Sequence, residues 1–248
     1  MEAMKLEARN ITKRFAGEII IKDVSIGLKE SELVSLLGVS GIGKSTLFNV
    51  ISGVLRSDAG TVTLNGEDIT GQAGKISYMQ QKDLLQQHMT VLDNVALPLF
   101  IRGIPKRDAR AEALMHFGEF GLEGTESRYP SQLSGGMRQR AALLRTYLFS
   151  HDVALLDEPF SALDAITKSA MHKWYLALMA RISMSTLFIT HDIDEAILLS
   201  DRIYIMTGPP GIIAHELAID APRPRGGEFL VSDTFVAYKR EILKMLSL

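Results

Sequence analysis

One stretch near the N-terminus has the residue types and the spacing of a phosphate-binding loop: Gly38-Val39-Ser40-Gly41-Ile42-Gly43-Lys44-Ser45-Thr46. It follows a strand candidate and opens a helix candidate, which is the context that phosphate binding requires. Glycines let backbone N–H groups turn inward around phosphate oxygens, and the N-terminus of the helix adds positive potential. Lys44 is expected to reach the β- and γ-phosphates of a nucleotide, and the Ser45 hydroxyl is expected to ligate Mg²⁺. A dinucleotide-binding loop is disfavoured because Thr46 stands where a third glycine would be needed.

A second stretch is an apolar strand that ends in two adjacent carboxylates: Val153-Ala154-Leu155-Leu156-Asp157-Glu158-Pro159. Asp157 suits the outer coordination shell of Mg²⁺, and Glu158 suits a base that polarises an attacking water. Such a pattern alone is usually a strand that meets solvent. Together with the phosphate loop, it favours hydrolysis of a nucleotide.

A third stretch places two glycines in the first turn of a predicted helix: Leu133-Ser134-Gly135-Gly136-Met137-Arg138-Gln139-Arg140. Ser134 stands at the expected N-cap, and Gly135 and Gly136 would let the backbone approach an anion at the positive end of the helix. The alternative is an ordinary capped helix. Because glycine destabilises a helix, two of them in one turn suggest a function.

These motifs lie within an alternation of short apolar runs and helix-length segments, which predicts an α/β protein with a mostly parallel sheet. Between residues 81 and 150 the strand-like runs disappear, so we expect a helical insertion there. A terminal amphipathic helix is expected at 228–248. Strands are predicted at 33–37, 75–79, 153–156, 186–190, 202–206 and 212–217, and helices of the insertion at 91–101, 105–120 and 134–149.

The composition limits what the chain can do. Its 248 residues are 46% hydrophobic, enough for a substantial core, and its formal net charge of −2 does not favour nucleic acid as a partner. No cysteine is present, which excludes disulfides and Cys-ligated metals. The N-terminal residues lack the apolar core of a signal peptide, and no stretch approaches the roughly 18 apolar residues that a spanning helix needs.

At residues 133–140 the chain resembles the ATP-binding subunit of ABC transporters, and the other family motifs follow in the expected order. The resemblance implies a single domain over 1–248 with a P-loop NTPase core at 1–85 and 150–220. It also implies N-terminal antiparallel strands, an inserted helical subdomain at 86–149, and a C-terminal connector and helix at 221–248. ATP and Mg²⁺ are the expected ligands. Expected partners are a second, identical ATPase subunit, transmembrane permease subunits and an extracytoplasmic solute-binding protein, with the chain peripheral at the cytoplasmic face of the membrane.

The resemblance also implies roles for particular residues. Ser134, Gly135 and Gly136 would bind the γ-phosphate of a nucleotide held by the opposite subunit, while Asp164 would lie in a loop that contacts that subunit. Phe15 would stack on adenine, although a Phe at such a position is as often part of the core.

Two further residues complete the implied site. His191, at the end of a predicted strand, would contact the γ-phosphate. Gln81 would touch Mg²⁺ and the water and would link the site to the membrane partner; the adjacent Gln80 is the alternative. Gln81 is favoured by counting back without gaps from Thr90-Val91-Leu92-Asp93-Asn94-Val95.

Three short sequence segments are similar to segments of importers of the nitrate, sulfonate and taurine type, a group that includes importers of thiamine precursors. The segments are Asp157–Ala165, His191–Ala196 and Pro222–Arg225. The sequence departs from the group at Gln86-Gln87-His88, where Leu-Pro-Trp is common. We therefore expect an ATPase that powers import of a small solute. The alternatives are an exporter or lipid-extraction motor, an ABC ATPase without transport, a P-loop kinase and an inactive homologue.

Overall fold

The computed structural model describes residues 4–150, 152–223 and 225–246. Its centre is a six-stranded sheet in which β9, β3, β8, β7 and β6 run parallel and β10 pairs antiparallel with β9. The strands in spatial order are β10 (Ile212–Ala218), β9 (Arg202–Thr207), β3 (Leu33–Leu37), β8 (Ser185–Thr190), β7 (Val153–Asp157) and β6 (Ser77–Met79). Every residue of β3, β7 and β8 is buried, which explains their continuous apolar runs. The predicted mostly parallel sheet is confirmed.

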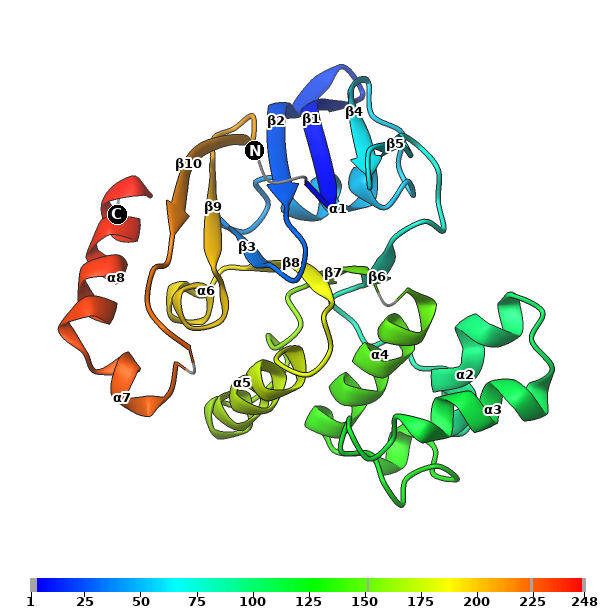
Figure 1. The fold of residues 1–248 in the computed structure, drawn as a ribbon. Coiled ribbons are helices and arrows are strands. Elements are labelled where there is room, and N and C mark those ends of the chain that lie inside the picture. Colours follow the sequence, from blue (N-terminus) through cyan, green and yellow to red (C-terminus); the bar gives the residue numbers. More distant parts are fainter. Residues whose placement is uncertain (1–3, 151, 224, 247–248) are drawn as a thin grey trace.

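One face of this sheet is covered by α1 and by a second, antiparallel sheet (Figure 1). That sheet has the order β2 (Glu18–Leu28), β1 (Leu6–Phe15), β4 (Ala59–Leu64) and β5 (Glu67–Asp68). Helix α1 (Lys44–Ile51) buries Leu47 and Phe48 in a core shared with both sheets. Since α1 follows β3 directly, this packing fixes the loop between them.

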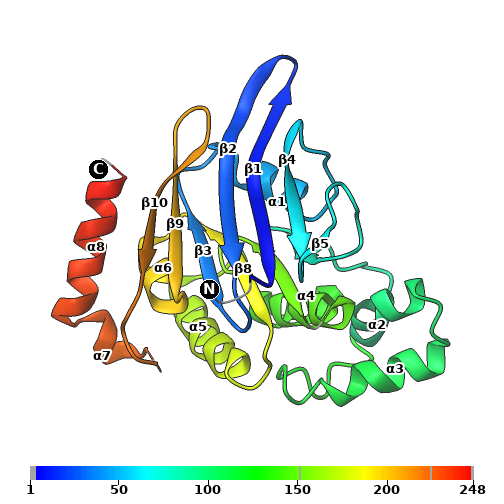
Figure 2. The ribbon, with the colours of Figure 1, turned by 45° about the horizontal axis from the view of Figure 1, so that its top comes forward.

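The opposite face carries α4, α5 and α6 (Figure 2). Along β7, Val153 and Leu155 join the core around α1, while Ala154 and Leu156 join the core beneath α4 (Gly135–Phe149) and α5 (Ala165–Met179). This is the alternation expected of a strand buried on both faces. Helix α6 (Ile193–Leu199) packs against α8 (Asp233–Met245), the last helix described.

The helical insertion places α2 (Val91–Ile101), α3 (Lys106–Met115) and α4 beside the β6 edge of the sheet (Figure 1). A 3₁₀ turn, η1 (Pro130–Gln132), precedes α4. Buried Asn94 holds the preceding loop: its Nδ2 donates to the carbonyl oxygens of Gln86, Met89 and Thr90, and its Oδ1 accepts from the Gln86 N–H.

Most predicted bounds agree with the structure within two residues. The predicted helix at 105–120 is too long: α3 ends at Met115, and residues 116–120 form turns. The predicted terminal helix is wrong in continuity: it is divided into α7 (Gly227–Leu230) and α8, because the Ser232 hydroxyl accepts from the Phe235 N–H and starts a new helix. Pro224 and residues 247–248 of the predicted C-terminal segment lie outside the described residues. Within the described part of the chain, none of the helices has the length and apolar character needed to cross a membrane.

Candidate functional site

A pocket of about 330 Å³ opens beside the N-terminus of α1, between the phosphate loop and the ends of β6 and β7. It brings together eight residues of the predicted site and adds the wall residue Ile20, which the sequence analysis missed. The lining residues are Ile20, Ser40, Gly41, Gly43, Lys44, Ser45, Thr46, Gln81 and Glu158.

The loop between β3 and α1 depends on glycine at two positions. Gly41 and Gly43 have φ values of 81° and 108°, a region that residues with a Cβ seldom adopt. A Cβ on Gly43 would also lie 2.6 Å from Cγ2 of buried Ile21. The loop therefore keeps its curvature and its approach to β2 only with glycine there.

Lys44 is buried inside the curve of this loop. Its Nζ donates to the carbonyl oxygens of Gly38 at 2.8 Å and Val39 at 2.9 Å. Burial lowers the pKa of Lys44, while the carboxylates of Glu158 and Asp157 act in the opposite direction. The ammonium and the N-terminus of α1 together favour an anion in the pocket.

Asp157 ends β7 with its carboxyl buried. Burial raises its pKa, although hydrogen bonds from Ser45 and Tyr78 favour the ionised form. The Tyr78 hydroxyl lies 3.4 Å from Asp157 Oδ2. Tyr78 was missed from sequence because its position opposite Leu155 comes from pairing between β6 and β7. Asp157 does not line the pocket itself, but its hydrogen bond from Ser45 connects it to a residue that does.

Glu158 is held between two segments that are distant in sequence. Its Oε2 lies 3.0 Å from Gln81 Nε2, its Oε1 lies 3.0 Å from His191 Nδ1, and its backbone N–H donates to the Ile189 carbonyl at 3.1 Å. Its φ of 47° is unusual for a residue with a side chain. Gln80 instead lines a neighbouring pocket, so Gln81 is the glutamine that reaches Glu158.

The remaining predicted residues do not line this pocket. Phe15 ends β1 with 47% of its surface exposed, and Lys13 Nζ lies 5.5 Å from its ring centroid. Asp164 caps α5, where one carboxylate oxygen accepts from the N–H groups of Ile166 and Thr167.

The residues of the third motif lie apart from the phosphate loop. The exposed Ser134 caps α4 as predicted, since its hydroxyl accepts from the Met137 N–H at 3.3 Å. Gly135 and Gly136 follow in the first turn of α4, and none of the three lines the pocket. Within a single chain, Lys44 thus lines the phosphate-loop pocket and Ser134 does not.

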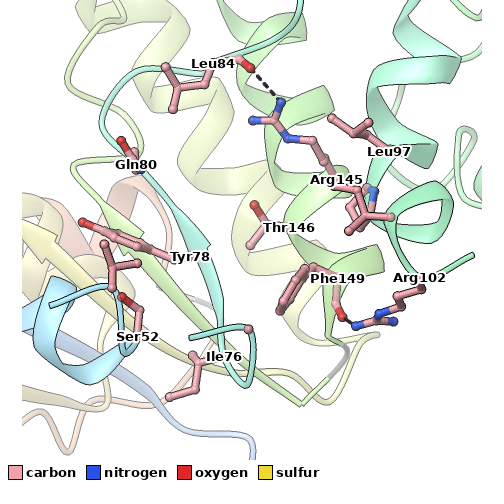
Figure 3. A pocket seen from close by; sticks show the side chains of 14 residues that line it. Ser52, Ile76, Tyr78, Gln80, Leu84, Leu97, Arg102, Arg145, Thr146 and Phe149 are labelled. Carbon is pink, nitrogen blue, oxygen red and sulfur yellow. Dashed lines mark hydrogen bonds between the residues drawn. The ribbon is translucent and has the colours of Figure 1, made fainter. Parts of the chain in front are cut away.

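A second, more apolar pocket of about 440 Å³ lies between segment 76–84 and helices α2 and α4 (Figure 3). Tyr78 and Gln80 form one wall, and Arg145 of α4 stands on the other, where its guanidinium donates to the Leu84 carbonyl at 2.9 Å. The exposed side chains of Val54, Leu84 and Ile101 contribute to the rim; we call this pocket the lateral groove. Segment 78–84 thus borders both the groove and the pocket that holds Glu158.

A strand, a glycine loop and a helix, with paired carboxylates ending a nearby parallel strand, define a P-loop nucleotide-binding ATPase. The family model described as ABC transporter matches residues 21–161, more than half of the chain. The chain therefore belongs to the ABC transporter family, as an ATP-binding cassette.

Individual relatives agree with this assignment. The chain is 48% identical to the formylaminopyrimidine import ATP-binding protein ThiZ of Halalkalibacterium halodurans, over 77% of this chain and 74% of that protein. It is 38% identical to the taurine import ATP-binding protein TauB of Pseudomonas aeruginosa, over 90% and 86% of the two chains. Among solved structures, it is similar to the dimeric ATP-binding cassette MJ0796 bound to ADP and phosphate. That match has a TM-score of 0.72 and 28% identity, and it covers 88% of this chain and 100% of the other.

Proposed function

We propose that this chain hydrolyses ATP to drive import of a small solute through a separate membrane-spanning partner. The observation that carries the proposal is the position of Glu158, which contacts both Gln81 and His191 at the edge of a pocket formed by Lys44 and Ser45. Import is supported by the relatives named above, which serve uptake of formylaminopyrimidine and taurine.

The residues around Asp157 fit Mg²⁺. Mg²⁺ prefers oxygen ligands and is usually held by one or two carboxylates together with substrate phosphates. Among the residues that the structure describes, no group of three or more His, Asp and Glu side chains could hold a metal ion by itself. The Ser45 hydroxyl, the Gln81 amide oxygen and the Asp157 carboxylate, acting with phosphate oxygens, would hold it. When bound, Mg²⁺ supplies positive charge that neutralises the phosphates.

In this proposal the chain mainly positions and polarises the reactants. The backbone and side chains of residues 38–46 hold the phosphates, and Lys44 turns its ammonium from the loop carbonyls to the β- and γ-phosphates. Glu158 orients the attacking water and accepts its proton, while Gln81 and His191 hold the two carboxylate oxygens and face the γ-phosphate. Phe15, exposed at the end of β1, stacks on adenine.

The active unit is two copies of the chain in a head-to-tail arrangement, as supported by the dimeric state of the similar cassette MJ0796. Ser134, Gly135 and Gly136 of one copy complete the site that Lys44 and Ser45 form in the other, with Asp164 at the interface. In this arrangement residues 1–85 and 150–220 form the nucleotide-binding core. Residues 86–149 are the subdomain that presents Ser134, and 221–248 form the C-terminal connector and helix.

The membrane partner is proposed to contact the lateral groove, because segment 78–84 joins the groove to Gln81. The chain would therefore lie at the cytoplasmic face of the membrane, and a solute-binding protein would deliver the solute from the other side. Solute uptake by the reconstituted complex, dependent on ATP and on the binding protein, would support import. Outward transport would contradict it and favour an exporter.

The composite site is tested by mixing two inactive variants. Lys44→Ala disables the phosphate loop of its own chain, whereas Ser134→Arg blocks the site completed in the other chain. In a mixed dimer both defects fall on one site and the second site is intact, so mixing should restore ATPase activity. If Lys44 and Ser134 serve the same nucleotide within one chain, the mixture stays inactive. Each variant alone is the matched control.

A further inference from the structure

A buried polar cluster joins α5 to α6, and its contacts reach the segments that carry Glu158 and His191. His172 of α5 and Glu195 of α6 are 7% and 4% exposed, and His172 Nε2 lies 2.9 Å from Glu195 Oε1. Neither residue lines the pocket at the phosphate loop. Polar side chains are mostly exposed, and burying them costs free energy unless they are hydrogen-bonded, so this pair suggests a function.

The Glu195 side of the cluster reaches the segment of His191. The Thr190 hydroxyl donates to Glu195 Oε2 and accepts from the Asp192 N–H at 3.0 Å. Thr190 and Asp192 are the residues immediately before and after His191. Through the Thr190 hydroxyl, the carboxylate of Glu195 therefore fixes the backbone immediately before and after His191.

Other contacts strengthen this end of the cluster. Asp192 caps α6 by accepting from the N–H groups of Asp194 and Glu195, and Lys168 of α5 lies 3.0 Å from the Asp192 carboxylate. Two contacts thus join α5 to α6 and its N-cap: the buried pair of His172 and Glu195, and the partly exposed pair of Lys168 and Asp192.

The His172 side of the cluster reaches the segment of Glu158. The imidazole and the ring of Phe160 are nearly perpendicular, with 4.9 Å between centroids and an interplanar angle of 82°. Phe160 is two residues after Glu158 and is 3% exposed. Its ring also packs against Tyr175 at 5.6 Å, so the loop after Glu158 is packed against the same helix that carries His172.

We propose that His172 is a positioning residue that keeps Glu158 and His191 in place relative to each other. It acts on Glu158 through Phe160. It acts on His191 through Glu195 and Thr190. The inference rests on the proposed roles of Glu158 and His191. A buried carboxylate that loses a donor is strongly destabilised, so without His172 Glu195 would shift and Thr190 would move with it. Displacements of about 1 Å at a reacting centre lower turnover by about 100-fold.

Four variants of the full-length chain test this role. His172→Leu removes the ring N–H, His172→Gln retains a donor at a similar reach, and Thr190→Val removes the linking hydroxyl at nearly constant volume. His215→Leu, in exposed β10, is the control. We expect kcat for ATP hydrolysis to fall by about 10- to 100-fold in His172→Leu and Thr190→Val, with KM for ATP unchanged. His172→Gln should recover most of kcat.

A second readout follows the imidazole itself. The ring NMR resonances of His191, assigned with His191→Gln, should shift in His172→Leu and Thr190→Val but not in His215→Leu. Unchanged kcat and unchanged His191 resonances in Thr190→Val would overturn the inference even if His172→Leu fails to fold. A lower melting temperature with normal kcat in His172→Leu would also overturn it, because that is the result of a purely structural role.

Glu158→Gln separates the positioning role of His172 from the proposed chemistry. If Glu158→Gln abolishes turnover while Thr190→Val and His172→Leu retain it, the positioning role is wrong and the proposed chemistry stands. If Glu158→Gln itself retains full turnover, the proposed chemistry is wrong, and the positioning role falls with it.

Discussion

His191 Nδ1 lies 3.0 Å from Glu158 Oε1, and this contact joins the ends of two neighbouring parallel strands, β8 and β7. The two side chains differ in exposure: His191 is 52% exposed and Glu158 is 13% exposed. The carboxylate is therefore sheltered by its neighbours, while half of the imidazole surface stays exposed. That asymmetry fits a base that must be held still and a partner that contacts the ligand.

Glu158→Gln should separate binding from turnover. The amide keeps the size of the carboxylate and one acceptor oxygen but cannot accept the proton of the attacking water. We expect turnover to fall by about 10²- to 10⁴-fold with ATP affinity retained, so that an ATP-bound dimer accumulates. Steady-state hydrolysis and size-exclusion chromatography with ATP measure both effects. Glu67→Gln, in exposed β5, is the control, and undiminished hydrolysis in Glu158→Gln would remove Glu158 from its role.

Lys44→Ala should weaken ATP binding. It removes a buried ammonium and leaves the Gly38 and Val39 carbonyls without that donor. A hydrogen bond to a charged group contributes about 1.5–3 kcal/mol, which is about ten- to a hundredfold in affinity. Isothermal titration calorimetry checks this, with exposed Lys75→Ala as the control. Normal ATP affinity in Lys44→Ala would contradict the assignment of the phosphate loop.

Gly43→Ala should be more costly than Gly66→Ala. Both glycines have positive φ, 108° and 82°, but a Cβ on Gly66 meets nothing within 4 Å, whereas one on Gly43 lies 2.6 Å from Ile21. The backbone conformation alone costs about 1–2 kcal/mol, and overpacking at Gly43 adds about 1–3 kcal/mol. Urea unfolding measures the difference. Equal destabilisation by the two substitutions would show that Ile21 does not constrain the loop.

The pair Asp93 and Arg110 should give the helical insertion a pH-dependent stability. Arg110 Nε and Nη2 lie 2.6 and 2.8 Å from the two Asp93 oxygens, and these hydrogen bonds lower the pKa of Asp93. Since the folded pKa lies below the unfolded value of about 3.9, the stabilisation is full above that value and is lost as the pH falls through the folded pKa.

Asp93→Asn should therefore lower the free energy of unfolding by about 0.5–1 kcal/mol at neutral pH, with a smaller difference from the unmodified chain in acid. Urea titrations at pH 7 and at about pH 3 compare the two conditions. Exposed Glu123→Gln is the control. A difference of the same size at both pH values would show that ionisation of Asp93 is not its source.

Local pattern was sufficient for the elements that carry the chemistry. The bounds of β3 and α2 match the prediction, and Ser134 caps α4 as expected, because burial periodicity and capping are properties of a few consecutive residues. The same local reasoning failed at the C-terminus, where Ser232 starts a separate helix within the segment predicted as one amphipathic helix.

The sequence by itself determined which side chains could bind phosphate and where the strands and helices that carry them begin. Only the tertiary structure decided which distant side chains meet. In the folded chain Tyr78 contacts Asp157, and His172 contacts Glu195. Gln81 and His191 contact the two carboxylate oxygens of Glu158. Spacing along the chain cannot predict these pairs. Those of Asp157 and Glu158 depend on strand order, because β6, β7 and β8 are neighbours although helical segments separate them in sequence. The pair of His172 and Glu195 depends on how α5 and α6 lie beside each other.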